Sequence, residues 1–150
     1  MTSLSPAVLF WTGYAGPVLV ASEHSAPWTV TVCNDPTTLV LPRRWLDVRG
    51  SKLDEFWTAA LRAIVGTIFV RPGISQAELR WRVRAVYDRQ EVVEAVVFLE
   101  QEGTLEARVD DRGGVLQGVK NVPGWAATLD EGEERSVYWF IGRNRHWYRV

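Results

Sequence analysis

The chain is poor in the residue types that build disulfides and metal centres. Its 150 residues include one cysteine, Cys33, and two histidines, His24 and His146. A single cysteine excludes an intramolecular disulfide and a cysteine-based zinc site. The histidines lie on opposite flanks of the central segment, and Ser25 beside His24 does not indicate a triad, because triads assemble in space. We therefore expect no metal, no cofactor and no enzymatic activity.

A surplus of charge and a long apolar run are missing as well. The formal net charge is −1, so no global field attracts nucleic acid or a membrane surface. No apolar run approaches the roughly 20 residues of a membrane span, and the first residues lack the basic start of a signal peptide. Gly113-Gly114 is not followed by the Lys-Ser or Lys-Thr of a phosphate loop. These absences predict an intracellular protein without a membrane or small-molecule partner. The abrupt ends of the chain favour a segment of a larger protein.

The clearest pattern that is present is a helical one that begins at Leu53. Apolar residues recur at three- and four-residue spacing from Leu53 to Ile68, which predicts a helix with one broad apolar face. The run Arg71-Pro72-Gly73 ends this helix, because proline cannot continue it and glycine relaxes the chain into a turn.

Two capping-box patterns predict two further helices. Ser75 stands three residues before Glu78, and Asp88 stands three residues before Glu91. Gly103 ends the third helix. The apolar residues expected to face the core are Leu79, Val83 and Val86 in the second helix, and Val92, Ala95, Val96 and Leu99 in the third.

Two alternating segments follow the helices and predict a pair of strands. Residues 104–109 and 136–141 alternate like half-buried strands. Residues 115–134 show no sustained period and are interpreted as an enlarged loop with an acidic patch at 130–134. Helix, short helix, helix and strand hairpin is the order of a winged helix. We therefore predict an α+β fold for residues 51–150, a winged helix of three helices plus a β wing.

Residues 1–50 are predicted to form a small β-containing N-terminal extension that packs on this core. Short apolar or β-branched runs occur at 8–11, 17–22, 28–32 and 38–41. The last two predict a hairpin across the turn residues Asn34-Asp35-Pro36. The run at 17–22 fits a short helix or a strand, and periodicity does not decide over so few residues. Trp45 in the lead-in to the first helix, and Trp57 in that helix, are expected to be largely buried.

The charge of the third helix argues against the usual DNA-binding mode of a winged helix. That mode places the third helix in the major groove. Residues 88–102 carry five carboxylates against one arginine, a local charge of −4, and such a surface repels phosphates. Its outward face is predicted to present Glu91, Glu94, Phe98, Gln101 and Glu102.

Two basic sites remain as candidates for DNA contact. The first is the second helix, with Arg80, Arg82 and Arg84. The second is the C-terminal tail, with Arg143, Arg145 and Arg149. The alternative is that these arginines lie over hydrophobic surface or pair with the acidic helix.

Three aromatic residues are candidates for binding a protein partner. Phe98 lies opposite the inward stripe of the third helix, with no obvious core to enter, and Trp147 and Tyr148 interleave with the tail arginines. Such residues dominate interface energetics. The alternative for the tail is that Trp147 and Tyr148 fold back on the extension and complete the core.

Several of these segments together resemble a known family. The chain is similar to the extended winged-helix domain of the largest subunit of the fungal RNA polymerase III transcription factor TFIIIC. The similarity spans about residues 42–150 and is carried by Pro42-Arg43-Arg44-Trp45-Leu46-Asp47, Gly50, Trp57, Ala60-Leu61, Arg71-Pro72-Gly73-Ile74, Glu91, Leu99 and Trp147-Tyr148. The resemblance implies a segment of a very large nuclear subunit that binds promoter DNA elsewhere in its chain.

Three hypotheses for function follow. The first is a non-catalytic module that connects subunits of a TFIIIC-like factor at transfer RNA gene promoters in the nucleus. The second is a winged helix that binds DNA directly through its second helix and basic tail. The third is an unrelated winged-helix adaptor, because a fold alone does not name the ligand.

Overall fold

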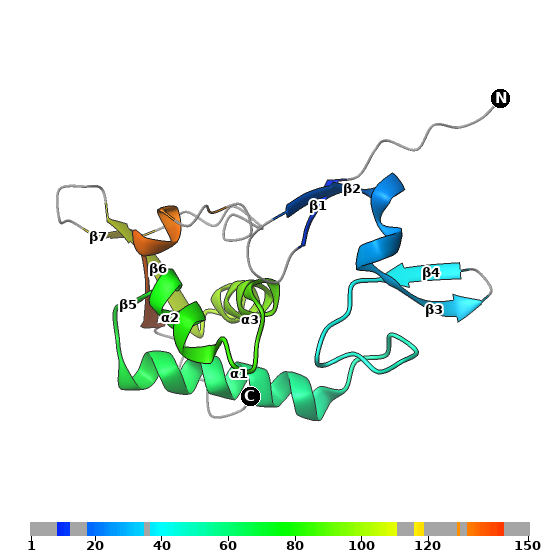
Figure 1. Cartoon of the computed structure of the whole chain (residues 1–150). Helices are drawn as coiled ribbons and strands as arrows, with labels where there is room; N and C mark the ends of the chain where they lie inside the picture. The colour runs from blue at the N-terminus through cyan, green and yellow to red at the C-terminus, as the bar shows by residue number, and fades with distance from the viewer. Residues whose placement is uncertain are drawn as a thin grey trace.

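The computed structural model describes residues 9–12, 18–34, 37–110, 116–118, 129 and 132–142. Within them the architecture is mixed α+β, as Figure 1 shows. The core elements are α1 (Asp54–Val70), β5 (Ile74–Ser75), α2 (Gln76–Val83), α3 (Arg89–Gln101), β6 (Leu105–Asp110), β7 (Leu116–Gly118), the 3-10 turn η4 (Glu133–Arg135) and β8 (Val137–Ile141). The three helices lie against a four-stranded antiparallel sheet with the strand order β5-β8-β6-β7.

The predicted helix starts are confirmed in their atomic detail. The side chain of Ser75 accepts a hydrogen bond from the Glu78 amide at 3.1 Å and starts α2. At the start of α3, Asp88 accepts from the Glu91 amide at 2.8 Å, and Glu91 accepts from the Asp88 amide at 3.0 Å. Both arms of the capping box are therefore formed. Gly73 has a φ of +79°, which closes the turn after α1 at low cost.

The expected inward position of Val86 is wrong. Helix α2 ends at Val83, and the amides of Val86 and Tyr87 both donate to the Val83 carbonyl in the turn that follows. Val86 is 48% exposed as a result. A spacing of three residues indicates one face only while the helix continues, and here the helix stops first.

The predicted strand pair is confirmed, and the segment between the two strands contains more structure than expected. β6 and β8 pair from Leu105 opposite Ile141 to Val109 opposite Val137. Residues 116–118, which were interpreted as loop, form β7 on the outer edge of β6. Residues 133–135 form the η4 turn. The other residues of this segment lie outside the described ones, except Leu129 and Gly132.

The core is a single cluster between the helices and the sheet. Its largest fully buried side chain is Trp139 on β8, whose indole Nε1 donates to Gln76 Oε1 at 2.6 Å. The other buried members come from α1, α2, α3 and the sheet: Leu61, Ile64, Val65, Ile68, Ile74, Leu79, Val92, Ala95, Val96, Leu99, Leu105, Ala107 and Val137. The inward stripes predicted for the first and third helices supply most of these residues.

The N-terminal region contains two hairpins. β1 (Leu9–Thr12) pairs with β2 (Val18–Ala21), so the run at 17–22 forms a strand in most of its length. β3 (Val30–Asn34) pairs with β4 (Thr37–Val40), as predicted, with a register irregularity between Thr31 and Cys33. Two 3-10 turns, η1 (Ser22–His24) and η2 (Ala26–Trp28), connect the hairpins, so Trp28 precedes the strand. Figure 1 places these four strands to one side of the helices.

Candidate interaction sites

The segment that leads into α1, which includes Arg43, Arg44 and Trp45, lies on the acidic surface of α3. We call it the lead-in. The Arg43 guanidinium donates to Glu94 Oε1 from Nε at 2.8 Å and from Nη2 at 2.5 Å. The amide of Arg44 donates to Glu91 Oε1 at 2.7 Å. Burial lowers the pKa of Arg43, but the bond to Glu94 and the neighbouring carboxylates outweigh it and leave the pKa above its ordinary value. Part of the charge of α3 is therefore neutralised within the chain.

The predicted exposure of Glu91 is wrong for the same reason. Glu91 is 4% exposed, because its carboxylate is shared between the capping box and the Arg44 amide. Glu94, Gln101 and Glu102 are exposed, as predicted.

The lead-in also completes an aromatic cluster. Trp45 is buried, with its ring centroid 4.7 Å from that of Trp57 in an edge-to-face arrangement. Trp57, which is half-buried, makes the same kind of contact with Phe98 at 5.2 Å. Lys52 Nζ lies 4.5 Å from the Trp57 ring centroid. The burial expected for Trp45 is confirmed, and that expected for Trp57 is met in part.

Phe98 has a place in the core that its helix position did not indicate. It was expected to lack a core to enter, but it is half-buried and packs against the main cluster through Trp57. The ring that packs on Phe98 is Trp57 of α1, so the sequence pattern of α3 alone could not predict this contact. The role of Phe98 in binding a partner stays a prediction. Only part of its ring is exposed for such a contact.

A buried ion cluster joins α2, α3 and η4. Glu134 is fully buried, and its Oε1 accepts from Arg89 Nε at 2.9 Å. Its Oε2 lies 3.3 Å from Arg80 Nη1, and Arg89 Nη2 donates to the Leu129 carbonyl. Glu134 was predicted to belong to an acidic patch in an enlarged loop, but it lies in the η4 turn and is buried against two arginines. The two arginines make its burial tolerable.

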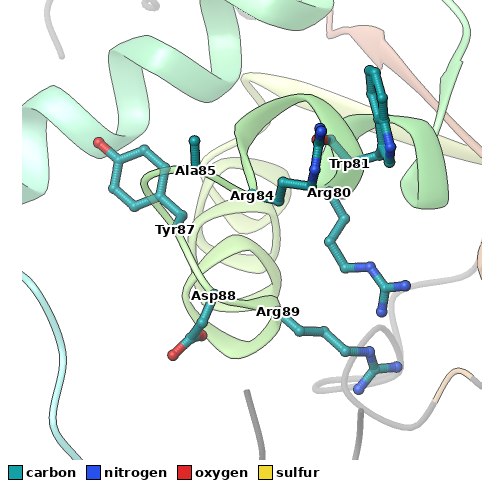
Figure 2. Close-up of a pocket in the computed structure, with 7 residues that line it drawn as sticks. All are labelled: Arg80, Trp81, Arg84, Ala85, Tyr87, Asp88 and Arg89. Atoms are coloured by element: carbon teal, nitrogen blue, oxygen red, sulfur yellow. The ribbon is translucent and has the colours of Figure 1, made fainter. Parts of the chain in front are cut away.

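Beside this ion cluster is a pocket of about 530 Å³ between the end of α2 and the start of α3. Figure 2 shows the seven residues that line it: Arg80, Trp81, Arg84, Ala85, Tyr87, Asp88 and Arg89. The side chains of Arg80 and Arg89 extend to one side of the view, and Asp88 extends to the other. The pocket thus gathers three arginines from two elements. We call it the arginine pocket.

Two features of the arginine pocket determine its chemistry. Arg89 is 2% exposed, and its Nη1 has no hydrogen-bond partner among the residues that the structure describes. The Arg84 guanidinium stacks 4.0 Å from the centroid of the Trp81 ring and donates to the Trp81 carbonyl. Burial, and next the charge of Glu91, raise the pKa of Tyr87 above its ordinary value of 10.0. The Tyr87 hydroxyl that lines the pocket is therefore neutral at physiological pH.

The candidate DNA-contact residues are divided among different surroundings. Arg80 and Arg84 line the arginine pocket, whereas Arg82 pairs with Glu78 at 2.9 Å on the same helix. Glu78 also pairs with Arg71 at 2.6 Å. Arg80 lies beside Glu134, Arg82 pairs with Glu78, and Arg84 stacks on Trp81. The acidic helix α3 is instead paired by Arg43, through Glu94. Arg143, Arg145, Trp147, Tyr148 and Arg149 lie outside the described residues.

Sequence reasoning missed Arg89 as a pocket residue. The four-residue spacing of Arg80 and Arg84 places those two on one side of α2, but Arg89 belongs to another helix. Only the packing of α3 beside α2 brings it to them.

A second missed surface is the outer face of α1. Between Phe56 and Val70 the helix carries one charged residue, Arg62, and it is therefore apolar on nearly all sides. The apolar and small residues opposite the core are exposed, with Phe56 at 57% and Val70 at 79%. Ala59, Ala63 and Gly66 continue the exposed row between them. The signal was present in the sequence: one broad apolar face was predicted for this helix, but the residues outside that face are also mostly apolar or small.

This face is hollowed near the C-terminal half of α1. A groove of about 510 Å³ has Ala63, Gly66 and Val70 among its walls, and its other lining residues are Arg62, Thr67, Arg71 and Arg82. A Cβ atom placed on Gly66 meets nothing within 4 Å. The lining therefore combines apolar and small residues with three arginines, of which Arg71 and Arg82 also pair with Glu78. We call this groove the α1 groove.

Among the described residues, no helix is long and apolar enough to cross a membrane. In the same part of the chain, no group of three or more histidine, cysteine, aspartate or glutamate residues is placed to hold a metal ion. Comparison of the chain with protein-family models, with curated protein sequences and with solved structures gave no match.

Proposed function

We propose that this chain is a non-catalytic protein-interaction module with a winged-helix arrangement. The observation that carries the proposal is the outer face of α1, where Phe56, Val70 and the small residues between them are exposed. A helix that is apolar on all sides is ordinarily buried, and exposed apolar patches mark interaction sites. The α1 groove suits an amphipathic helix, because its lining combines apolar and small residues with arginines.

The order of the elements supports the winged-helix part of the proposal. A short strand, β5, lies between α1 and α2 and pairs with β8, which in turn pairs with β6 after α3. The hairpin of β6 and β8 takes the place of the wing, and β7 extends it.

The surroundings of α3 support protein binding over base reading. Arg43 and Arg44 contact Glu94 and Glu91, so the lead-in occupies part of the face that would enter a major groove. A duplex would have to displace this segment and would then meet carboxylates.

The assignment to a TFIIIC-like factor of the RNA polymerase III system rests on the resemblance. The residues that carry it have structural roles here: Trp45 packs on Trp57, Gly73 closes a turn, and Glu91 caps α3. Such roles support a shared scaffold. The partners in this proposal are other subunits of the factor, in the nucleus, at transfer RNA gene promoters.

The test is a charge placed on the outer face of α1. We expect Ala63→Arg to leave thermal stability nearly unchanged, because the position is exposed, and to abolish co-purification with the other subunits of the factor. Gln101→Arg, at an exposed position on α3, is the matched control and should co-purify normally. If Ala63→Arg folds and still assembles like the control, the α1 face is not the interaction surface and the proposal fails.

A second candidate function is direct DNA binding through α2. Arg80, Arg84 and the 59% exposed Trp81 favour it. In that case we expect weak, non-specific binding to duplex DNA, with a dissociation constant of roughly 10⁻⁴ to 10⁻⁶ M at physiological salt. A salt titration of the binding measures it, and the absence of salt dependence would exclude this candidate.

A further inference from the structure

We infer that the arginine pocket binds one oxyanionic group, a carboxylate or a phosphate, carried by a peptide segment of the partner. This inference rests on the proposed function only for the source of the group, since the pocket is separate from the α1 groove. The geometry of Arg89 and Arg84 points to the anion itself.

Arg89 supplies a cation that is buried and incompletely satisfied. Its Nε donates to Glu134 and its Nη2 donates to the Leu129 carbonyl, but within the described part of the chain Nη1 has no acceptor. A buried guanidinium donor without an acceptor is unfavourable, and Arg89 lines the pocket. An oxygen atom of a ligand at this position restores the missing hydrogen bond.

The charge balance around the pocket favours one anion. Among the described residues, three arginines, Arg80, Arg84 and Arg89, line the pocket beside one carboxylate, Asp88, and the Glu134 carboxylate contacts Arg80 and Arg89. The Asp88 carboxylate is already engaged with the Glu91 amide at the start of α3. Arginine therefore predominates among the described residues that line the pocket, and this favours an anionic ligand.

Arg84 and Trp81 prepare the mouth of the pocket. The contact of Arg84 with the Trp81 ring and carbonyl holds the guanidinium in place before a ligand arrives. A pre-positioned arginine loses less side-chain freedom when it binds an oxyanion, and its planar donors suit carboxylate and phosphate oxygens. The exposed Trp81 ring offers apolar surface to the rest of a peptide.

The neighbourhood of the pocket favours a peptide over nucleic acid. Asp88, Glu91 and Glu94 follow one another along the first turns of the adjacent helix. A duplex carries a closely spaced row of phosphates, several of which would meet these carboxylates. A peptide brings a single charge to the arginines and can avoid the acidic helix.

The experiment is an NMR titration of the whole chain with inorganic phosphate at constant ionic strength. The signals followed are the arginine Nε–Hε groups and the Trp81 indole. We expect saturable shifts for Arg84 and Arg89, with affinity reduced about tenfold or more in Arg84→Gln, which removes a charge-assisted bond. Arg82→Gln is the matched control, because Arg82 is on the same helix but does not line this pocket. It should change the affinity less than about twofold.

The source of the anion is tested with three short peptides that differ at one position, which is glutamate, phosphoserine or glutamine. Binding of either charged peptide at Arg84 and Arg89, with no binding of the glutamine peptide, supports the inference and identifies the group. The absence of saturable phosphate shifts would overturn it, and so would equal weakening by Arg84→Gln and Arg82→Gln. Tighter binding of duplex DNA than of both charged peptides at the same signals would assign the pocket to nucleic acid instead. Ala63→Arg should bind phosphate normally, so failure of the α1 proposal is separable from failure here.

Discussion

Replacement of Glu134 by glutamine is the sharpest test of how the helices are held to the η4 turn. Glu134 is fully buried, lies 2.9 Å from Arg89 and 3.3 Å from Arg80, and is the acid of the buried cluster. Glu134→Gln keeps the size of the side chain but leaves Arg89, itself 1% exposed in its side chain, without its counter-charge. Removal of one member of a buried ion pair costs about 3–5 kcal/mol. Because glutamine retains one acceptor oxygen, we expect a loss near the lower end, about 3 kcal/mol.

The loss is measured by urea and thermal unfolding followed by circular dichroism. For a domain of this size, 3 kcal/mol corresponds to a decrease in Tm of about 6–12 °C. The matched control is Glu133→Gln in the same turn, which is exposed and should change stability by less than about 0.5 kcal/mol. A loss below about 1 kcal/mol for Glu134→Gln would refute the assignment of the cluster as a buried, mutually dependent pair. The double variant Arg89→Met/Glu134→Leu, which removes both charges, should recover much of the lost stability.

Three further predictions concern the core, the outer face of α1 and the response to acid. Trp139→Phe removes the donor to Gln76 Oε1 in a fully buried site and should cost about 1–3 kcal/mol for the unsatisfied amide, plus a cavity term; a neutral result in urea unfolding would contradict the buried bond. Gly66→Ala should raise the free energy of unfolding by about 1 kcal/mol, because the added methyl group meets nothing within 4 Å in a helix interior, and a decrease would show hidden crowding. The hydrogen bond from Arg82, and next that from Arg71, hold the pKa of Glu78 below its ordinary value of 4.5, although desolvation opposes them. This contribution to stability is complete above pH 4.5 and is lost as the pH falls through the lower folded-state pKa, so Glu78→Gln should flatten the unfolding profile in that acidic range.

Local sequence patterns determined where the helices and paired strands of this protein begin. The capping box at Asp88 formed with both arms, and Ser75 formed the side-chain arm of its predicted box, because these bonds join groups only three residues apart. The alternation of residues 104–109 and 136–141 was enough to pair β6 with β8, since one buried face fixes a register. Trp45 was also placed correctly in the core.

The tertiary structure alone decided which polar and aromatic side chains are enclosed. Glu134 was interpreted as part of an acidic patch in a loop, and its burial depends on Arg89, 45 positions earlier in the chain. Phe98 looked unpartnered on its helix, and its partner is Trp57 on α1. A helical or alternating pattern reports which residues share a face, but it does not report what another element places against that face. The arginine pocket has the same origin, because the neighbours of Arg80 and Arg84 are fixed only when α3 packs beside α2 and brings Arg89 to them.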